Sequence, residues 1–324
     1  MKILALDADD VASSLPMKEC IEEMSRAFGS VDGSIQSPLR TRLEAESGDV
    51  LVMPSMMKRK VLEASVKVVS IFPKNTGKVP SISSAVLLVD GENGEVKAVM
   101  DGRSLTSIRT GAVSGLSCRY LARKDSRTLG VVGAGVQAFQ QVNGVVTALA
   151  GIESVRVFSR TKAKSAALAK RCRKELGVDS SVEADVRECA RSDVVVTATT
   201  AKAPVFDGRD VRPGTHVIAI GSFRPEVREV DSALVRRSTV FVDSRAEALE
   251  EAGDIIIPMK EGVVSGDAIE ADLSELVGGS RKGRRDDSQV TFFKSVGLAF
   301  EDNAAGWLAY RRASRKRLGT WTKI

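Results

Sequence analysis

The segment VVGAGVQAFQQV, which begins at Val131, carries glycines at the spacing of a phosphate-binding turn. Gly133, Gly135 and Ala138 fit G-x-G-x-x-A, in which the glycines allow a tight turn and a close pyrophosphate, and the small third residue allows close helix–strand packing. Such a turn can also be a packing solution alone. Here an apolar strand precedes it, a helical segment follows, and a second strand comes about 20 residues later. The pattern therefore predicts a dinucleotide site at a helix N-terminus.

The second strand, SVRVFS, indicates which dinucleotide is bound. NAD-preferring sites usually end this strand in Asp or Glu, which binds the ribose 2′-hydroxyl. No carboxylate stands at Ser159, Arg160 or Thr161, and the Arg160 guanidinium suits a 2′-phosphate. We therefore expect NADP(H) to be favoured, with NAD(H) as the alternative. The competing interpretation is that Arg160 is a surface residue beside a helix cap.

Isolated cations interrupt otherwise apolar segments in the first third of the chain. Arg40 lies in SPLRTR, Lys67 in ASVKVVSIF and Arg109 in SIRTGAVSG. A lysine within such a strand must reach an edge or face a cavity with an anionic partner, because burying it unpaired is costly. Each cation alone would suit the surface or a salt bridge. The three together indicate a pocket for a carboxylate.

The segment VIAIGSFRPEVRE has the pattern of a buried strand that ends at Gly221 and opens into a loop. Ligands of open α/β sheets lie just past the carboxyl ends of the strands, where Ser222 and the apolar Phe223 stand. His216, the only histidine of the chain, begins this strand and is interpreted as structural. A His-based triad and a zinc site of several histidines are therefore excluded, so Lys, Asp, Glu, Tyr or water must move protons.

The composition is that of an ordinary globular chain: 324 residues, 43% hydrophobic and 28% charged, with a net charge of +6. We expect a cytoplasmic protein without a membrane span, because no uncharged apolar run of about 18 residues occurs. The basic clusters at 281–285 and 311–317 are interpreted as solvated surface rather than a nucleic-acid patch. Four cysteines lack C-x-x-C spacing, which favours idle thiols and predicts no metal site.

Two kinds of pattern must position these residues. Residues 1–32 predict a short strand and a helix, 37–98 predict a mainly antiparallel sheet, and 104–122 predict a helix of small residues. From Thr128 onward, apolar strands alternate with helices, which is typical of a parallel sheet built from βαβ units. A long helix is predicted over 295–313, with an apolar face that could pack on the first domain.

Six blocks of the sequence resemble, in order, those of the ornithine cyclodeaminase/mu-crystallin family. They are MPSM, VKVVSIFPKN, LLVDGENGEVKAVMDGRSLTSIRTGAVSG, VVGAGVQA, GSFRPEVREVD and FKSVGLAFED. The resemblance covers nearly the full length and implies an α/β fold, with a Rossmann-type doubly wound parallel sheet at 123–302. It further implies an α/β substrate-binding and dimerisation domain, formed by 1–122 with 303–324. The implied partners are a small imino or amino acid and a second copy of the chain, not a nucleic acid or a membrane.

The resemblance also implies roles for particular residues. Arg40 and Arg109 would clamp the substrate carboxylate, Lys67 would touch it or relay a proton, and Phe223 would line the substrate pocket. The residues that would hold the dinucleotide are Thr110, Gly133, Gly135, Val136, Gln137, Ala138, Ser159, Arg160, Thr161, Thr197, Thr199, Thr200, Gly221, Ser222, Lys294, Ser295 and Gly297.

One departure from the family pattern bears on the reaction. Cyclodeaminases carry an Asp two residues after the glycine of the GSFRPEVREVD block, where this chain has Phe223, so the chain resembles the reductase branch. We therefore expect NAD(P)H-dependent hydride transfer to C2 of a 2-imino acid. The expected substrate is a cyclic ketimine, 1-pyrroline-2-carboxylate or 1-piperideine-2-carboxylate, giving an L-amino acid such as proline. The alternatives are alanine dehydrogenase, ornithine cyclodeaminase and a non-catalytic small-ligand binder, in that order.

Overall fold

The computed structural model describes residues 2–31, 33–76 and 78–323. Packing divides the chain into two compact units, Met1–Arg109 with Leu298–Ile324, and Thr110–Gly297. The division falls within helix α3 (Gly102–Leu121), which runs on through residue 109 without a break. The boundaries expected from the sequence, after 122 and after 302, lie 13 and 5 residues further along the chain than those at 109 and 297. Among the described residues, no helix combines the length and the apolar composition that a membrane crossing requires.

The first unit, which we call the mixed-sheet unit, is built on one eight-stranded sheet. Its neighbouring strands pair antiparallel, as the sequence pattern predicted, except that β1 and β7 run parallel. The strand order is β16-β1-β7-β6-β5-β4-β2, with β3 also paired to β4. The strands are β1 (Lys2–Leu6), β2 (Ile35–Gln36), β3 (Thr41–Ala45), β4 (Gly48–Lys58), β5 (Leu62–Ile71), β6 (Ile82–Asp90), β7 (Val96–Asp101) and β16 (Thr320–Lys323).

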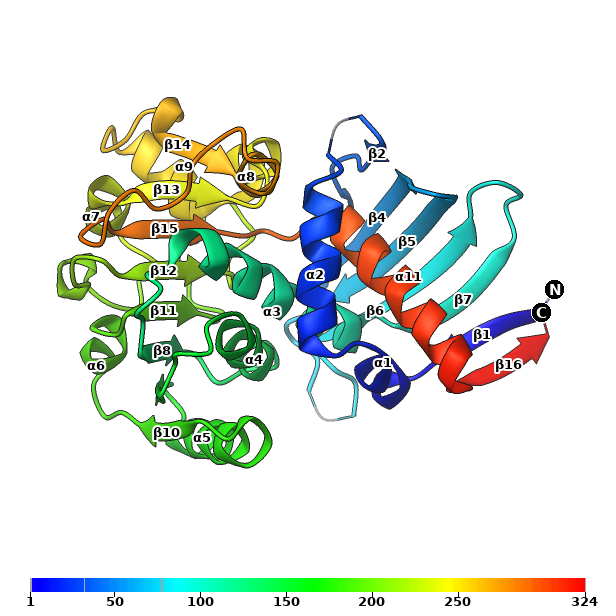
Figure 1. Ribbon diagram of the computed structural model, residues 1–324, viewed down its shortest axis with the longest axis horizontal. Helices are drawn as coiled ribbons and strands as arrows, with labels where there is room; N and C mark the ends of the chain where they lie inside the picture. The colour runs from blue at the N-terminus through cyan, green and yellow to red at the C-terminus, as the bar shows by residue number, and fades with distance from the viewer. Residues whose placement is uncertain (1, 32, 77, 324) are drawn as a thin grey trace. The chain divides into compact units, whose positions relative to one another are not determined.

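Three helices cover one face of this sheet, namely α1 (Ala8–Ser14), α2 (Met17–Phe28) and α11 (Ala299–Lys316) (Figure 1). Burial alternates along β4, because successive side chains of a strand point to opposite faces. Helix α11 lies against β4 and β5, where the Asn303 side chain donates to the backbone carbonyls of Ser55 and Glu63. The covered face therefore holds the core of this unit, together with the polar groups of α11.

The second unit, which we call the parallel-sheet unit, contains eight parallel strands in the order β10-β9-β8-β11-β12-β15-β13-β14. The chain starts at β8, adds β9 and β10 on one side, and then places β11 and β12 on the other. This reversal between β8 and β11 is the switch point at which doubly wound sheets bind ligands. The strands are β8 (Thr128–Val132), β9 (Ser154–Phe158), β10 (Asp179–Val182), β11 (Val194–Thr197), β12 (His216–Ala219), β13 (Thr239–Val242), β14 (Ile269–Asp272) and β15 (Thr291–Lys294).

The central strands β8, β11 and β12 are buried along almost their whole length because helices cover both faces of the sheet, as the alternating sequence pattern predicted. Helices also connect most strands, as crossovers between parallel strands require. The helices that follow α3 are α4 (Ala138–Ala148), α5 (Lys162–Leu176), α6 (Val186–Ala190), α7 (Ser232–Arg237), α8 (Arg245–Glu251), α9 (Gly253–Lys260) and α10 (Leu273–Val277).

Two helix predictions need correction. The helix expected over 295–313 begins instead at Ala299, because Asp243 binds the backbone N–H groups of Val296 and Gly297. Gly297 also has a φ of 81°, in the left-handed region that favours glycine and that ends helices. The single helix expected before residue 32 is α2, and a further helix, α1, precedes it.

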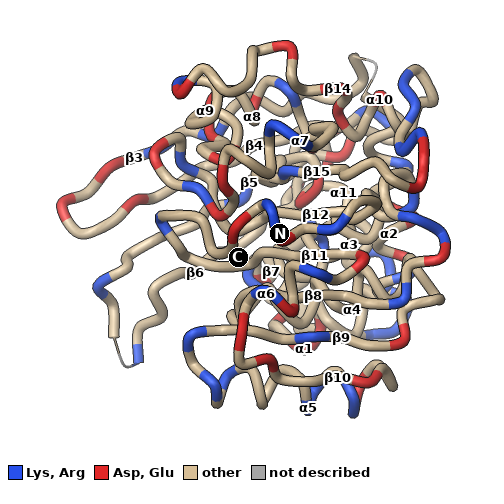
Figure 2. Tube along the Cα trace, turned by 90° about the vertical axis from the view of Figure 1, so that its left-hand side faces the viewer, with Lys and Arg blue, Asp and Glu red and all other residues tan. Residues whose placement is uncertain are grey.

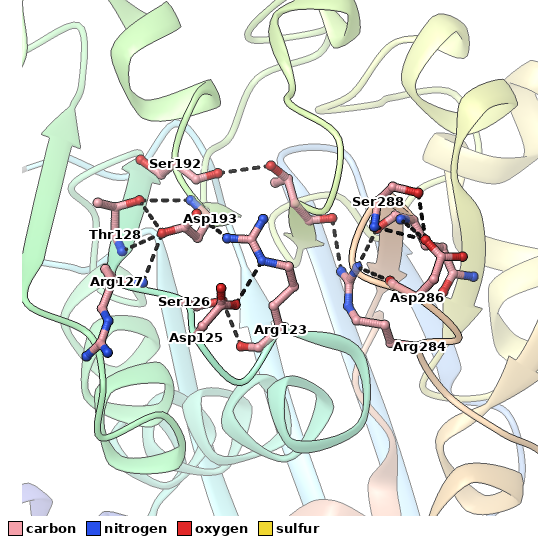
Figure 3. Close-up of polar contacts among 12 residues, drawn as sticks. Arg123, Asp125, Ser126, Arg127, Thr128, Ser192, Asp193, Arg284, Asp286 and Ser288 are labelled. Carbon is pink, nitrogen blue, oxygen red and sulfur yellow. Dashed lines mark hydrogen bonds and ion pairs between the residues drawn. The ribbon is translucent and has the colours of Figure 1, made fainter.

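Asp193 organises the edge of the parallel sheet where β8 and β11 begin (Figure 3). Its carboxylate accepts hydrogen bonds from the backbone N–H groups of Arg127 and Thr128 and from Arg123. On the same edge, Arg284 donates to the carbonyl of Asp286 (Figure 3), and it also donates to the carbonyl of Leu121. Arg284 belongs to the basic cluster 281–285, so part of that cluster is internal structure rather than solvated surface.

The remaining basic residues are interspersed with acidic ones along the chain (Figure 2). His216 is fully buried, 2.9 Å from the hydroxyl of Thr291 and 3.2 Å from that of Ser117, and burial lowers its pKa to about 3. The four cysteines are free and buried. Burial raises the pKa of Cys20, Cys118 and Cys189 to about 12, so these thiols are not nucleophiles at neutral pH.

Candidate functional site

A hollow of about 460 Å³ lies at the carboxyl edge of the parallel sheet, beside the switch point. Three loops line it: the turn after β8, the end of β9 with the start of α5, and the segment after β11. The lining includes seven of the residues expected to bind the dinucleotide: Gly133, Gly135, Ser159, Arg160, Thr161, Thr199 and Thr200. The fold thus brings together three segments that the sequence pattern had indicated separately.

The turn after β8 has the shape that a phosphate-binding turn requires. Gly133 has a φ of 109°, and a Cβ there would collide with the carbonyl of Ala198. Its N–H donates to the carbonyl of Phe158 at 2.8 Å, which holds the turn between the neighbouring strands. Among the described residues, apart from Gly135 and its two chain neighbours, no atom lies within 4 Å of the place that a Gly135 Cβ would occupy. A pyrophosphate could therefore approach the Gly135 backbone, and the turn fits a dinucleotide.

Positive charge gathers where β9 passes into α5. Arg160 lines the hollow, and so does Lys164, which sequence reasoning had missed. The first turn of α5 carries lysines at the helix end where acidic residues are usually stabilising. The hydroxyl of Ser159 donates to the Thr161 carbonyl at 2.9 Å and lies 2.8 Å from that of Ser165, so these bonds hold the end of β9 to the start of α5.

The buried carboxylate of Glu229 joins the loops after β11 and β12. It accepts hydrogen bonds from the hydroxyls of Thr197 and Thr199 at 3.0 and 2.8 Å, and from the N–H groups of Thr199 and Gly221 at 2.7 and 2.6 Å. Burial raises the pKa of Glu229, although Lys294 opposes this shift. Thr197, Thr199 and Gly221 are thus held by a side chain that sequence reasoning did not single out.

A second buried carboxylate, Asp254, explains the position of Lys294. The Lys294 ammonium lies 3.0 Å from Asp254 Oδ2 and donates to the Ser222 carbonyl at 2.6 Å. Asp254 Oδ2 also accepts from the Ser222 hydroxyl at 2.8 Å. Burial would raise the pKa of Asp254, but Lys294 and several hydrogen bonds hold it below its ordinary value. Lys294 is fully buried, so its bonds go to protein atoms rather than into the hollow.

A third buried carboxylate, Asp243, holds the segment that follows β15. Its Oδ2 accepts from the Ser295 hydroxyl at 2.8 Å and from the N–H groups of Val296 and Gly297, both at 2.7 Å. Six residues expected at the dinucleotide lie outside the hollow and belong to these carboxylate networks: Thr197, Gly221, Ser222, Lys294, Ser295 and Gly297. The other four expected there, Thr110, Val136, Gln137 and Ala138, do not line it either.

A separate charged cluster is buried in the mixed-sheet unit. Lys67 on β5 lies 3.0 and 3.1 Å from the two carboxylate oxygens of Asp302 on α11. The Nε of Arg109 donates to Asp302 at 3.2 Å, and its Nη1 donates to Glu301. The carboxylates were not singled out from the sequence, although they form the end of the FKSVGLAFED block. They supply the anionic partners that an apolar strand with an internal lysine requires.

Burial lowers the pKa of Lys67 to about 8 from its ordinary 10.5. The positive charges of Arg109 and Arg40 act in the same direction, while Asp302 opposes them. Arg40, which is half-buried, is therefore close enough for its charge to act on the lysine. For Asp302, burial would raise the pKa, but Arg109 and Lys67 hold it below its ordinary value.

Phe223 belongs to the parallel-sheet unit and is half-buried in the loop after β12. No group of three or more His, Cys, Asp or Glu residues in the described part of the chain is arranged to hold a metal ion.

Comparison with known proteins assigns the family. The model of the ornithine cyclodeaminase/mu-crystallin family matches residues 1–317. The chain belongs to this family. A family relative, a Δ1-pyrroline-2-carboxylate reductase of Bacillus cereus, is 37% identical over an alignment of 326 positions, which covers 98% of this chain and 98% of the relative.

Two solved structures of family relatives share the fold. One is Δ1-pyrroline-2-carboxylate reductase of Thermococcus litoralis in complex with NADH and L-proline. Its TM-score is 0.94 at 42% identity, with 98% of this chain and 99% of that chain covered. The other is an archaeal alanine dehydrogenase dimer with bound NAD, with a TM-score of 0.93 at 31% identity and full coverage of both chains. The fold and the family expected from the sequence blocks are thus confirmed.

Proposed function

We propose that this chain reduces a cyclic 2-imino acid, 1-pyrroline-2-carboxylate, to L-proline at the expense of NADPH or NADH. The observation that carries the proposal is the buried cluster of Lys67 and Arg109 with Asp302 and Glu301, in a chain that also has a dinucleotide hollow. The relatives that reduce Δ1-pyrroline-2-carboxylate support the substrate. In the reaction the imine carbon gains a hydride, the imine nitrogen gains a proton, and the nicotinamide is oxidised.

The residues of the chain would have the following roles in this reaction. When bound in the hollow, the nicotinamide dinucleotide supplies the hydride. Arg109 and Arg40 would bind the substrate carboxylate, since a guanidinium matches a carboxylate in geometry and charge. Asp302 and Glu301 hold Arg109, which fixes the direction of its guanidinium. Lys67 would donate a proton to the imine nitrogen, because a pKa of about 8 suits proton transfer near neutral pH.

A substrate comparison tests the proposal. NADPH and NADH consumption should be measured with 1-pyrroline-2-carboxylate and with 1-piperideine-2-carboxylate. The expected result is turnover of at least one ketimine with L-proline as the product of the five-membered ring. Failure to turn over either ring with either cofactor contradicts the proposal.

Alanine dehydrogenase is the second candidate, because the solved alanine dehydrogenase covers the whole chain with the same fold. Pyruvate with ammonia, assayed beside the preformed ketimines, separates the two activities. Phe223 argues against ornithine cyclodeamination, since an apolar ring cannot handle an amine as a carboxylate does. Release of ammonia from L-ornithine with catalytic NAD would show that the chain is an ornithine cyclodeaminase.

The rate of reduction is expected to depend on the ionisation of Lys67. Because its folded-state pKa is about 8, the proton donor is present below this pH and is lost above it. We expect kcat/KM for imine reduction to fall about tenfold per pH unit above 8, while oxidation of L-proline rises up to that pH. Profiles in both directions between about pH 6 and pH 10 measure this. If the fall in kcat/KM above pH 8 persists in Lys67→Arg, the ionisation belongs to another group.

The same pKa shift has a consequence for stability. The folded-state pKa of Lys67 lies below the ordinary 10.5, so between pH 8 and 10.5 the unfolded chain binds the proton and the folded chain does not. The contribution of Lys67 to folding stability therefore rises with pH across this window.

We propose that NADP(H) is preferred over NAD(H), with Arg160 and Lys164 as partners of the 2′-phosphate. Both line the hollow beside Ser159. Arg160→Ala and Lys164→Ala are each expected to raise KM for NADPH about tenfold, because a charge-assisted hydrogen bond contributes about 1.5–3 kcal/mol. KM for NADH should change less than twofold. Steady-state kinetics with both cofactors measures the two KM values in each variant.

Lys162→Ala is the matched control, since Lys162 is on the same helix turn but does not line the hollow. We expect it to leave both KM values within twofold of wild type. Equal KM values for NADPH and NADH in the wild type would contradict the preference.

We further propose that the parallel-sheet unit binds the dinucleotide and the mixed-sheet unit forms a homodimer. The sheet face opposite α2 and α11 is apolar across its strands: Pro54, Val66, Leu87 and Val99 lie side by side in register. Val68 on this face is 43% exposed. A contiguous apolar face of this kind marks an association surface, and a second copy could cover it.

Val68→Lys is expected to yield a monomer, because a lysine at the centre of the apolar face would be buried without a partner. Light scattering after gel filtration measures the mass, which is 34.6 kDa for one chain. Leu249→Lys, at an exposed apolar position of α8, is the control and should keep the wild-type mass. If Val68→Lys is still a dimer, or if the wild type is a monomer, the proposal that this sheet face forms the dimer interface is contradicted.

A further inference from the structure

The loops after β11 and β12 are joined by one side chain, Glu229. Its Oε1 accepts from the N–H and the hydroxyl of Thr199, and its Oε2 accepts from the N–H of Gly221 and the hydroxyl of Thr197. Glu229 is fully buried, so water does not compete for these bonds. Each carboxylate oxygen therefore holds the backbone of a different loop.

Packing around Gly221 shows how closely the loops approach each other. A Cβ at Gly221 would collide with the carbonyl of Thr199 and would lie 2.6 Å from Glu229 Oε1. The two loops thus meet at the carboxylate with no room for a side chain. A displacement of Glu229 must move one loop or both.

The chemistry of this position requires a carboxylate. Both oxygens face backbone N–H donors, and an amide at residue 229 would turn its own NH2 group toward the N–H of either Thr199 or Gly221. Two donors cannot share a hydrogen bond, so one loop would lose its attachment. Asp254 fixes the carboxylate from behind, because its Oδ1 accepts from the backbone N–H groups of Glu229 and Val230 at 2.6 and 3.0 Å.

These loops stand where the nicotinamide half of a dinucleotide belongs. In a doubly wound sheet the two halves of the dinucleotide lie on opposite sides of the switch point. Arg160 and the end of β9 lie on the adenosine side, while β11 and β12 lie on the other. Thr199 itself lines the hollow.

We propose that Glu229 is a positioning residue that sets the nicotinamide half of the bound dinucleotide by holding both loops at once. The inference rests on the proposed dinucleotide-dependent function. Glu229 acts through Thr199 and Gly221 and needs no contact with the cofactor. Its loss therefore affects the nicotinamide half and leaves the adenosine half in place.

The experiment compares two probes on Glu229→Gln. Dissociation constants are measured for NADPH, by its fluorescence, and for 2′,5′-ADP, which contains only the adenosine side, by calorimetry. If the wild type binds NADH more tightly, NADH and ADP replace this pair. We expect NADPH to bind at least tenfold more weakly, with 2′,5′-ADP within twofold of wild type. We also expect kcat for imine reduction to fall about 10²-fold, because small misplacements of reacting groups are costly.

Glu226→Gln is the matched control, since this glutamate lies in the same loop with its side chain 61% exposed. It should leave both dissociation constants unchanged. If Glu229→Gln does not fold, Thr197→Val removes one hydrogen bond to Oε2 without changing the shape, and it should weaken NADPH binding about threefold or more with 2′,5′-ADP unchanged.

Two outcomes overturn the inference: unchanged binding of both probes, or an equal loss of both, which would indicate a purely structural role. Both readouts are independent of the substrate. If the wild type binds NADPH but reduces no imine, the proposed reaction fails while the inference about Glu229 is still tested.

Discussion

Replacing Lys67 with methionine is expected to lower kcat for imine reduction by about 10³-fold, which is within the range for loss of a general acid. The imine nitrogen must gain a proton as its carbon gains the hydride. Lys67 is buried, is held by Asp302 at 3.0 Å, and has a pKa lowered by burial to about 8. The fold should survive, because Arg109 still pairs with Asp302 in the variant. Stopped-flow or steady-state kinetics at pH 7 measures the loss.

A second substitution separates proton transfer from carboxylate binding. Lys67→Arg keeps the positive charge, but a guanidinium does not release its proton at neutral pH. If Lys67 is the donor, both variants should be impaired in kcat by a similar factor. If it only binds the carboxylate, Lys67→Arg should recover kcat while Lys67→Met raises KM. Lys60→Met, at an exposed position, should retain wild-type kinetics. If Lys67→Met retains more than a tenth of the wild-type kcat, Lys67 is not the proton donor.

Asp254→Asn is expected to cause the largest loss of stability, about 3–5 kcal/mol in the free energy of unfolding. Asp254 and Lys294 are both fully buried and lie 3.0 Å apart. An asparagine would keep Oδ1 for the N–H groups of Glu229 and Val230. It would place either a neutral oxygen or an NH2 group beside the Lys294 ammonium. The buried cation would then lack a counter-charge.

Lys294→Met should cost less, roughly half as much, since the remaining carboxylate keeps charge-assisted hydrogen bonds from the Ser222 hydroxyl and two backbone N–H groups. Urea unfolding followed by circular dichroism, under one set of conditions, ranks the variants. Asp267→Asn, at an exposed position, is the control and should change the unfolding free energy by less than about 0.5 kcal/mol. If Lys294→Met proves the more damaging variant, the hydrogen bonds to Asp254 contribute less than its geometry indicates.

Much of the parallel-sheet unit could be predicted from the sequence, because its signals are local. The turn at Gly133 depends on neighbours within a few residues, and apolar strands that alternate with helices indicate a parallel sheet wherever they occur. The antiparallel sheet of the other unit also follows from short β-type runs and a turn at 90–95. Helix starts were less predictable: Ala299 begins α11 only because Asp243, far away in the chain, holds the preceding residues.

For the candidate site, too, some features follow from the sequence alone and others arise only in the folded chain. Composition and spacing alone establish a chain with one histidine, a glycine-rich turn and isolated cations in apolar segments, since these are properties of residue type and order. The partners of those cations come from the folded chain: Asp302 lies 235 residues from Lys67 in sequence. The counter-charge of Lys294, Asp254, lies 40 residues before it in the chain. A buried charge needs an opposite charge close in space, and proximity in space between distant residues arises only when sheets and helices pack.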